Sequence, residues 1–255
     1  MFIIKVKEKS KLKKVGEWMG IYLNPGSAMF QKSLKSKIYV DKSGLLAILN
    51  ELVDTEQRYV CVSRPRRFGK SMAANMLAAY YGSSEDTSAL FASLEISQCA
   101  GYRDHLNQYD VLKINMQDFL SESQSIEDML AHLTACLIRD LKNGFPQIDF
   151  SYAKSLVSVM REVFAQTGRS FVILIDEWDC LFREYESNKE AQKQYLDFLR
   201  VWLKDKEYVG LAYMTGILPI KKYGSHSALN MFTEYSMTNP REMAGYFGFT
   251  EDEVK

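Results

Sequence analysis

Cysteine, histidine and proline are scarce in this sequence. It has four cysteines, three histidines and five prolines among 255 residues, and the cysteines lie far apart, at positions 61, 99, 136 and 180. No cysteine pair has C-x-x-C spacing and no histidine stands at metal-ligand spacing, so neither a zinc site nor a disulfide framework is indicated. We expect reduced, mostly buried thiols, as in a cytoplasmic protein.

An excess of charge of one sign and long apolar runs are also absent. Lys plus Arg and Asp plus Glu each number 32. This balance argues against a general electrostatic attraction to nucleic acid or to an anionic membrane. No segment approaches the roughly 18 consecutive apolar residues of a membrane span, and the amino terminus lacks the apolar core of a secretory signal. We therefore expect no membrane partner, and any recognition of phosphate must come from a local feature.

The chain after about residue 36 alternates between expected strands and expected helices. Apolar runs predict strands at 59–63, 111–116, 171–177, 208–216 and 232–237. Helical periodicity and end signals predict helices at 45–53, with Ser43 as its N-cap, and at 70–81, 125–142, 151–167 and 189–205. This alternation predicts an α/β fold with a mostly parallel sheet flanked by helices. Residues 1–36 are expected to form an irregular leader.

The segment 59–71 has the order of a phosphate-binding loop. An apolar run is followed by a basic turn and then by Gly69-Lys70-Ser71 at the start of a helix. In such a loop, backbone N–H groups surround a polyphosphate in front of the positive end of the helix. Lys70 would reach the β- and γ-phosphates and Ser71 would ligate Mg²⁺. The general pattern G-x-x-x-x-G-K-[ST] requires glycine where this chain has Arg64, so a solvated basic turn is the alternative.

We assign the whole loop to nucleotide binding. One of its arginines can neutralise phosphate charge, and the alternative is that they form structural salt bridges. Proline stiffens the loop but removes one N–H donor. The predicted nucleotide-binding residues are Arg64, Pro65, Arg66, Arg67, Phe68, Gly69, Lys70 and Ser71.

A second motif closes the most apolar of the expected strands. Asp176 is placed to hold the Mg²⁺ shell and Glu177 to polarise an attacking water, since ligands bind at the carboxyl ends of parallel strands. The alternative is an ordinary exposed strand end. The adjacent Asp-Glu pair favours hydrolysis over transfer to a substrate hydroxyl. Thr215 closes another strand and would contact the γ-phosphate or the water if that strand lies between the other two; otherwise it is an ordinary strand residue.

Several segments together resemble the bacterial family of predicted AAA-ATPases. They are residues 38–43, 63–71, 175–177, 214–217 and 228–234, and the string Arg-Pro-Arg-Arg-Phe-Gly-Lys-Ser is highly specific to that family, in which arginine at position 64 is usual. The resemblance, from about residue 20 onward, implies a P-loop NTPase core of the additional-strand class with sheet order 5-1-4-3-2. It also implies that Lys70, Ser71, Asp176 and Glu177 are the loop and Walker B residues. Asp41 and Lys42 are family hallmarks for which the sequence suggests no mechanism beyond helix entry.

The last residues indicate the start of another helix. Thr250 and Glu253 form a capping-box pattern with acidic residues in the first turn. Members of the family usually continue into a helical lid and often into a PD-(D/E)XK nuclease-like domain. The expected organisation is a leader at 1–36 and an AAA-ATPase-like domain at 37–255 that is truncated before its lid. Without a lid, water exclusion over the nucleotide would be poor and hydrolysis slow.

The function predicted from these motifs is ATP binding and Mg²⁺-dependent hydrolysis of the γ-phosphate. Lys70, Glu177 and Thr215 are the predicted catalytic residues, and Ser71 and Asp176 the predicted metal ligands. ATP turnover would be coupled to an unknown protein partner or downstream domain. Two alternatives remain: a nucleotide-dependent interaction module without meaningful hydrolysis, and an accessory protein that binds nucleic acid through the arginines at 64–67 and the lysines at 5–14.

Overall fold

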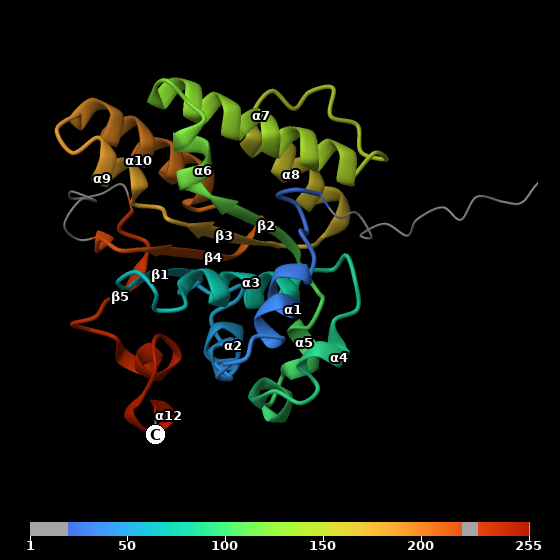
Figure 1. Ribbon diagram of the computed structural model, residues 1–255. Helices are drawn as coiled ribbons and strands as arrows, with labels where there is room; N and C mark the ends of the chain where they lie inside the picture. Colours follow the sequence, from blue (N-terminus) through green and yellow to red (C-terminus); the bar gives the residue numbers. More distant parts are fainter. Residues whose placement is uncertain (1–19, 221–228, 255) are drawn as a thin grey trace, which may run out of the picture.

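The protein folds around one five-stranded parallel sheet (Figure 1). The structure is a computed structural model, and it describes residues 20–220 and 229–254. The lysine-rich stretch at 5–14, most of the expected leader and residues 221–228 lie outside the described residues. The strands run in the order β2-β3-β4-β1-β5, and every neighbouring pair is parallel. They are β1 (Tyr59–Ser63), β2 (Asp110–Asn115), β3 (Phe171–Asp176), β4 (Val209–Gly216) and β5 (Thr233–Tyr235).

The sheet confirms the α/β class and the strand order that the family resemblance implied. Counted from the β5 edge, the order is 5-1-4-3-2. Every residue of β1, β3 and β4 is buried. This burial on both faces explains why their sequences are nearly continuous apolar runs instead of alternating patterns.

Helices cover both faces of the sheet. In Figure 1 one layer lies above the sheet, and its apolar side chains share a core with the upper face. It consists of α6 (Met116–Ser121), α7 (Ile126–Gly144), α8 (Leu156–Thr167), α9 (Cys180–Glu184) and α10 (Lys189–Leu203). The second layer packs below, around a separate core. It consists of α1 (Ala28–Leu34), α2 (Gly44–Asn50), α3 (Lys70–Tyr81), α4 (Ser88–Phe91), η1 (Glu95–Gln98) and α5 (Tyr102–His105).

Three local expectations need correction. The leader is not irregular throughout, because residues 28–34 form α1, whose buried Phe30 stacks on Phe91 at 5.1 Å between ring centroids. Ser43 occupies the N-cap position of α2, but its side chain does not cap the helix. Its hydroxyl instead accepts a hydrogen bond from the N–H of Ile96 at 3.1 Å, which ties α2 to η1. The helix expected from residue 151 begins at Leu156.

The carboxyl ends of the three central strands meet at one edge of the sheet. Ser63 of β1 is in register with Gly216 of β4, and Ile175 of β3 pairs with Met214 of β4. The loop after β1, the acids at the carboxyl end of β3 and the end of β4 therefore lie side by side. After β5 the chain forms η2 (Arg241–Tyr246) and α12 (Glu251–Val254). No helix within the described ranges is long and apolar enough to cross a bilayer.

Candidate functional site

The predicted phosphate loop connects β1 to α3 in a tight turn. The strand ends at Ser63 and the helix begins at Lys70, as the sequence predicts. Arg67 and Gly69 have positive φ angles of 70° and 81°. A Cβ atom added at Gly69 would meet no atom within 4 Å, so glycine is favoured there by its backbone conformation and not by lack of space.

Lys70 is folded back over this loop. Its Nζ atom donates hydrogen bonds to the carbonyl oxygens of Arg64 and Pro65, each at 3.0 Å, and the residue is only 5% exposed. Burial lowers the pKa of Lys70, and the nearby carboxylates of Glu177 and Asp176 oppose that change. The loop therefore holds a buried cation at the amino end of α3.

Asp176 joins the loop to the two neighbouring strands. Its Oδ2 accepts a hydrogen bond from the Ser71 hydroxyl at 2.5 Å. Its Oδ1 accepts bonds from the Thr215 hydroxyl and from the N–H of Glu177. Since β4 lies between β1 and β3, the condition that the sequence argument set for Thr215 is met. The structure thus brings Ser71, Asp176 and Thr215 into direct contact.

Glu177 is held by an arginine that the sequence argument missed. Its backbone has a positive φ of 53°, and its Oε2 lies 2.7 Å from Nη2 of Arg183 on α9. The same Nη2 donates to Oε1 of Gln117 on α6 at 3.2 Å. An ion pair between residues 177 and 183 depends on the left-handed turn after β3, and no periodicity in the sequence signals it.

Asp179 fixes the turn that follows β4. It is fully buried, and its Oδ2 accepts hydrogen bonds from the N–H groups of Ile217 at 3.0 Å and Leu218 at 2.7 Å. Gly216 allows this packing, because a Cβ atom there would lie 2.7 Å from Nε1 of Trp178 and 2.8 Å from Oδ1 of Asp179. The segment after Glu177 and the end of β4 are therefore mutually fixed.

Comparison with known proteins identifies the family of this chain. The sequence matches the family described as Predicted AAA-ATPase over residues 27–225, which is well over half of the chain. The chain belongs to the predicted AAA-ATPase family. It is also 26% identical over 221 residues to an uncharacterized protein from the vnfD 5′ region of Azotobacter chroococcum mcd 1. The aligned part covers 85% of this chain and 40% of that protein, so the chain spans less than half of the relative's length.

The arginines of this predicted AAA-ATPase loop differ in their surroundings. Arg64 is buried, and its Nη1 donates to the carbonyl oxygens of Ser63 at 2.9 Å and Tyr235 at 2.6 Å. Its guanidinium lies 5.3 Å from the centre of the Phe247 ring. Arg64 therefore ties the loop to β5 and to the segment after η2. This is a structural role, as one of the two interpretations of the loop arginines expected, but hydrogen bonds form it instead of salt bridges.

The other two loop arginines are exposed. Within the described part of the chain, the side chains of Arg66 and Arg67 form no hydrogen bond or ion pair. Structural salt bridges, the alternative considered for them, are thus not formed with described residues. Both side chains are free to meet an anion at the loop, and that role stays a prediction.

Asp41 and Lys42, the family hallmarks without a mechanism, have defined partners in the predicted AAA-ATPase. The Asp41 carboxylate accepts the N–H of Ser43 at 2.8 Å and that of Glu95 at 2.7 Å, joining α2 to η1. Lys42 Nζ donates to the carbonyl oxygen of Gly245 at 2.7 Å and pairs with Glu253 at 2.6 Å. The predicted capping box forms in part, since the Glu253 carboxylate accepts the N–H of Thr250 at 2.8 Å.

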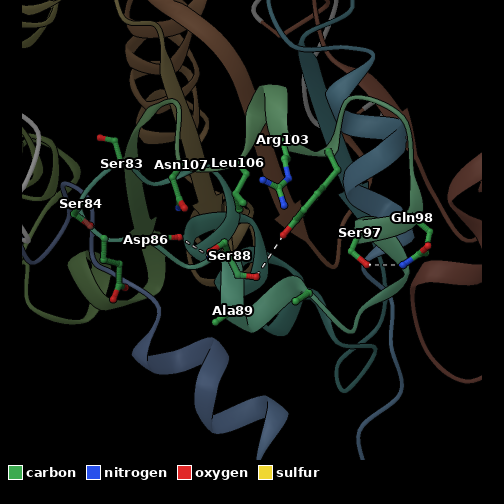
Figure 2. A pocket seen from close by; sticks show the side chains of 13 residues that line it. Ser83, Ser84, Asp86, Ser88, Ala89, Ser97, Gln98, Arg103, Leu106 and Asn107 are labelled. Carbon is green, nitrogen blue, oxygen red and sulfur yellow. Dashed lines mark hydrogen bonds between the residues drawn. The ribbon is translucent and has the colours of Figure 1, made fainter.

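Two hollows differ in their relation to the loop. The larger, about 840 Å³, lies on the segments that follow α3, and polar side chains such as Ser83, Ser88 and Asn107 make up much of its lining (Figure 2). It contains none of the predicted site residues. The smaller, about 150 Å³, includes Phe68 and Gly69 of the loop itself. Proximity to the loop, and not size, identifies the second as part of the candidate site.

Proposed function

We propose that this chain binds Mg-ATP at the loop between β1 and α3 and hydrolyses its γ-phosphate. The observation that carries the proposal is the 2.5 Å hydrogen bond between Ser71 and Asp176. It joins the two predicted metal ligands, which lie 105 residues apart in the sequence, directly beside the buried cation of Lys70. A buried lysine, a hydroxyl and a carboxylate at the amino end of a helix form a set that suits a bound polyphosphate.

The residues present fit Mg²⁺. No group of three or more His, Cys, Asp or Glu side chains that could hold a metal occurs among residues 20–220 and 229–254. In phosphate sites, however, this ion usually takes one or two protein oxygens and completes its shell with phosphate and water oxygens. Ser71 Oγ and Asp176 Oδ2 supply two such oxygens. When bound, the ion would neutralise phosphate charge and align the triphosphate.

Each remaining side chain has a role that its present contacts allow. Lys70 would exchange the two loop carbonyl oxygens for phosphate oxygens, which offer a charged acceptor in place of neutral ones. Thr215 would hold Asp176 in place. Glu177 would accept a proton from the attacking water, and to do so its carboxylate must be free of Arg183.

The ion pair between Glu177 and Arg183 also favours a second candidate function. A carboxylate oxygen that lies 2.7 Å from an arginine nitrogen is engaged by that arginine and is not available to an attacking water. A chain that keeps this pair with nucleotide bound would act as a nucleotide-dependent interaction module with little turnover. The partner in that case would respond to occupancy of the loop.

Single-turnover phosphate release from ATP separates the two functions. With the chain in excess over radiolabelled Mg-ATP, we expect the parent to release phosphate well above the Glu177→Gln variant. Both should bind ATP with affinities within about twofold, because Glu177 is not a predicted nucleotide ligand. ATP binding without phosphate release above that of Glu177→Gln would reject hydrolysis and support the module.

A further inference from the structure

Arg183 of α9 lies between two carboxylates that follow β3. Its Nη2 is 2.7 Å from Oε2 of Glu177, and its Nη1 is 4.0 Å from Oδ1 of Asp179. Burial lowers the pKa of Arg183, but the charge of Asp179 and then the contact with Glu177 outweigh that effect, so the pKa is raised on balance. Both carboxylates therefore stabilise the same cation, although Glu177 alone is close enough to accept a hydrogen bond from it.

Asp179 is a fixed carboxylate with one oxygen to spare. The residue is fully buried, and its Oδ2 accepts the N–H groups of Ile217 and Leu218. Its Oδ1 is also buried and accepts no hydrogen bond from any residue that the structure describes. Within the same described ranges, the buried Nη1 of Arg183 donates none. A buried acceptor and a buried donor without partners each raise the free energy of the fold, and here they lie 4.0 Å apart.

Gln117 of α6 helps to keep the guanidinium at Glu177. Its Oε1 accepts a hydrogen bond from Nη2 of Arg183 at 3.2 Å, and its Nε2 donates to the exposed Glu184 at 2.6 Å. Both acceptors of the arginine thus lie on its Nη2 side. A shift of about 1 Å toward Asp179 would bring Nη1 within hydrogen-bond distance of Oδ1.

A base at position 177 requires that Arg183 have another partner. Glu177 can take a proton from the attacking water only after its carboxylate leaves the arginine. The guanidinium stays charged in proteins, and its side chain is only 19% exposed, so water does not fully replace the lost carboxylate. Asp179 is the buried carboxylate within reach, and its backbone contacts hold it in place.

We propose that Arg183 exchanges Glu177 for Asp179 when the site turns over ATP, and that Asp179 is the positioning residue that receives it. The inference rests on the proposed function, because the exchange frees the base of that same reaction. One ion pair breaks and another forms, so the buried cation stays paired while Glu177 becomes free. Asp179 thereby acts on the reaction through Arg183 and does not touch the nucleotide.

A double-mutant cycle in single-turnover phosphate release tests the exchange. Asp179→Asn keeps an oxygen for the N–H groups of Ile217 and Leu218 but removes the charge that receives Arg183. Release should slow by at least about tenfold in the parent, the lower end for a lost charge-assisted hydrogen bond. In an Arg183→Gln background the same change should alter release by less than about twofold, because no cation remains to be received.

Asp140→Asn is the matched control for the loss of a buried carboxylate. Asp140 of α7 is 4% exposed, and its Oδ2 accepts the N–H groups of Tyr22 and Leu23, as Asp179 accepts two such groups after β4. This variant should release phosphate at the parent rate. Calorimetric titration should give ATP affinities within about twofold of the parent for every variant, since neither aspartate is a predicted nucleotide ligand.

The outcomes separate the exchange from the proposed function. Equal slowing by Asp179→Asn in the parent and in the Arg183→Gln background would assign a purely structural role to Asp179 and overturn the exchange. An Asp179→Asn chain as fast as the parent, or an Asp140→Asn chain as slow as Asp179→Asn, would overturn it as well. If the parent releases phosphate no faster than Glu177→Gln, hydrolysis fails and the exchange fails with it.

Discussion

Replacement of Gly216 by alanine should destabilise the protein at the point where β4 meets the candidate site. The new Cβ atom would lie 2.7 Å from Trp178 Nε1 and 2.8 Å from Asp179 Oδ1, and both residues are fully buried. Neither side chain can move into solvent, and Asp179 also holds the backbone N–H groups of Ile217 and Leu218. Overpacking of this kind costs about 1–3 kcal/mol.

Thermal unfolding followed by calorimetry measures this cost. In a chain of this size, 1 kcal/mol shifts Tm by about 2–4 °C, so Gly216→Ala should lower Tm by roughly 2–12 °C. Gly245→Ala is the matched control, because a Cβ atom there meets nothing within 4 Å and the residue has no positive φ. Its Tm should stay at or slightly above that of the parent. A Tm for Gly216→Ala equal to that of Gly245→Ala would refute the argument.

Two further substitutions test the contacts of the acids after β3. Thr215→Val removes the hydroxyl that donates to the buried Asp176 and should lower the free energy of unfolding, measured in urea, by about 1–3 kcal/mol. Thr215→Ser keeps a hydroxyl and should recover most of this loss. A valine variant as stable as the parent would contradict the assignment of this contact. Arg183→Gln frees Glu177 from a charge-assisted hydrogen bond that contributes about 1.5–3 kcal/mol. ATP turnover should therefore rise, and the full loss of that bond energy sets an upper limit of about 10- to 150-fold on the increase. Arg200→Gln, which breaks an exposed pair with Asp197, is the control; slower turnover in Arg183→Gln would place that arginine in the reaction itself.

Local elements were predictable because their signals are local. The strand at 59–63 and the helix at 70–81 have the predicted bounds, since an apolar run, a turn and Gly82 mark them in the sequence. The short helix α1 was missed because it lies in a stretch without clear periodicity next to turn residues. The order of the strands came from the family resemblance and not from the residues, because strand adjacency is a tertiary property.

The candidate site was predictable where residues follow strand ends. Ser71, Asp176 and Thr215 meet because parallel strands place their carboxyl ends together. Arg183 was not predictable, because its contact with Glu177 depends on a left-handed residue. Lys42 was not interpretable either, since its partner Glu253 lies 211 residues away.

Binding of Mg-ATP to the parent and to Lys70→Ala tests the central claim most directly. Lys70 is the buried cation of the loop, and a hydrogen bond to a charged group contributes about 1.5–3 kcal/mol. The variant should therefore bind Mg-ATP about 10- to 150-fold more weakly than the parent in calorimetric titration. Lys206→Ala alters a lysine that precedes β4. It lies at the amino ends of the parallel strands, whereas the loop lies at their carboxyl ends, so this variant should leave the affinity unchanged. A Lys70→Ala chain that binds ATP as tightly as the parent would contradict the assignment of this loop as a nucleotide site.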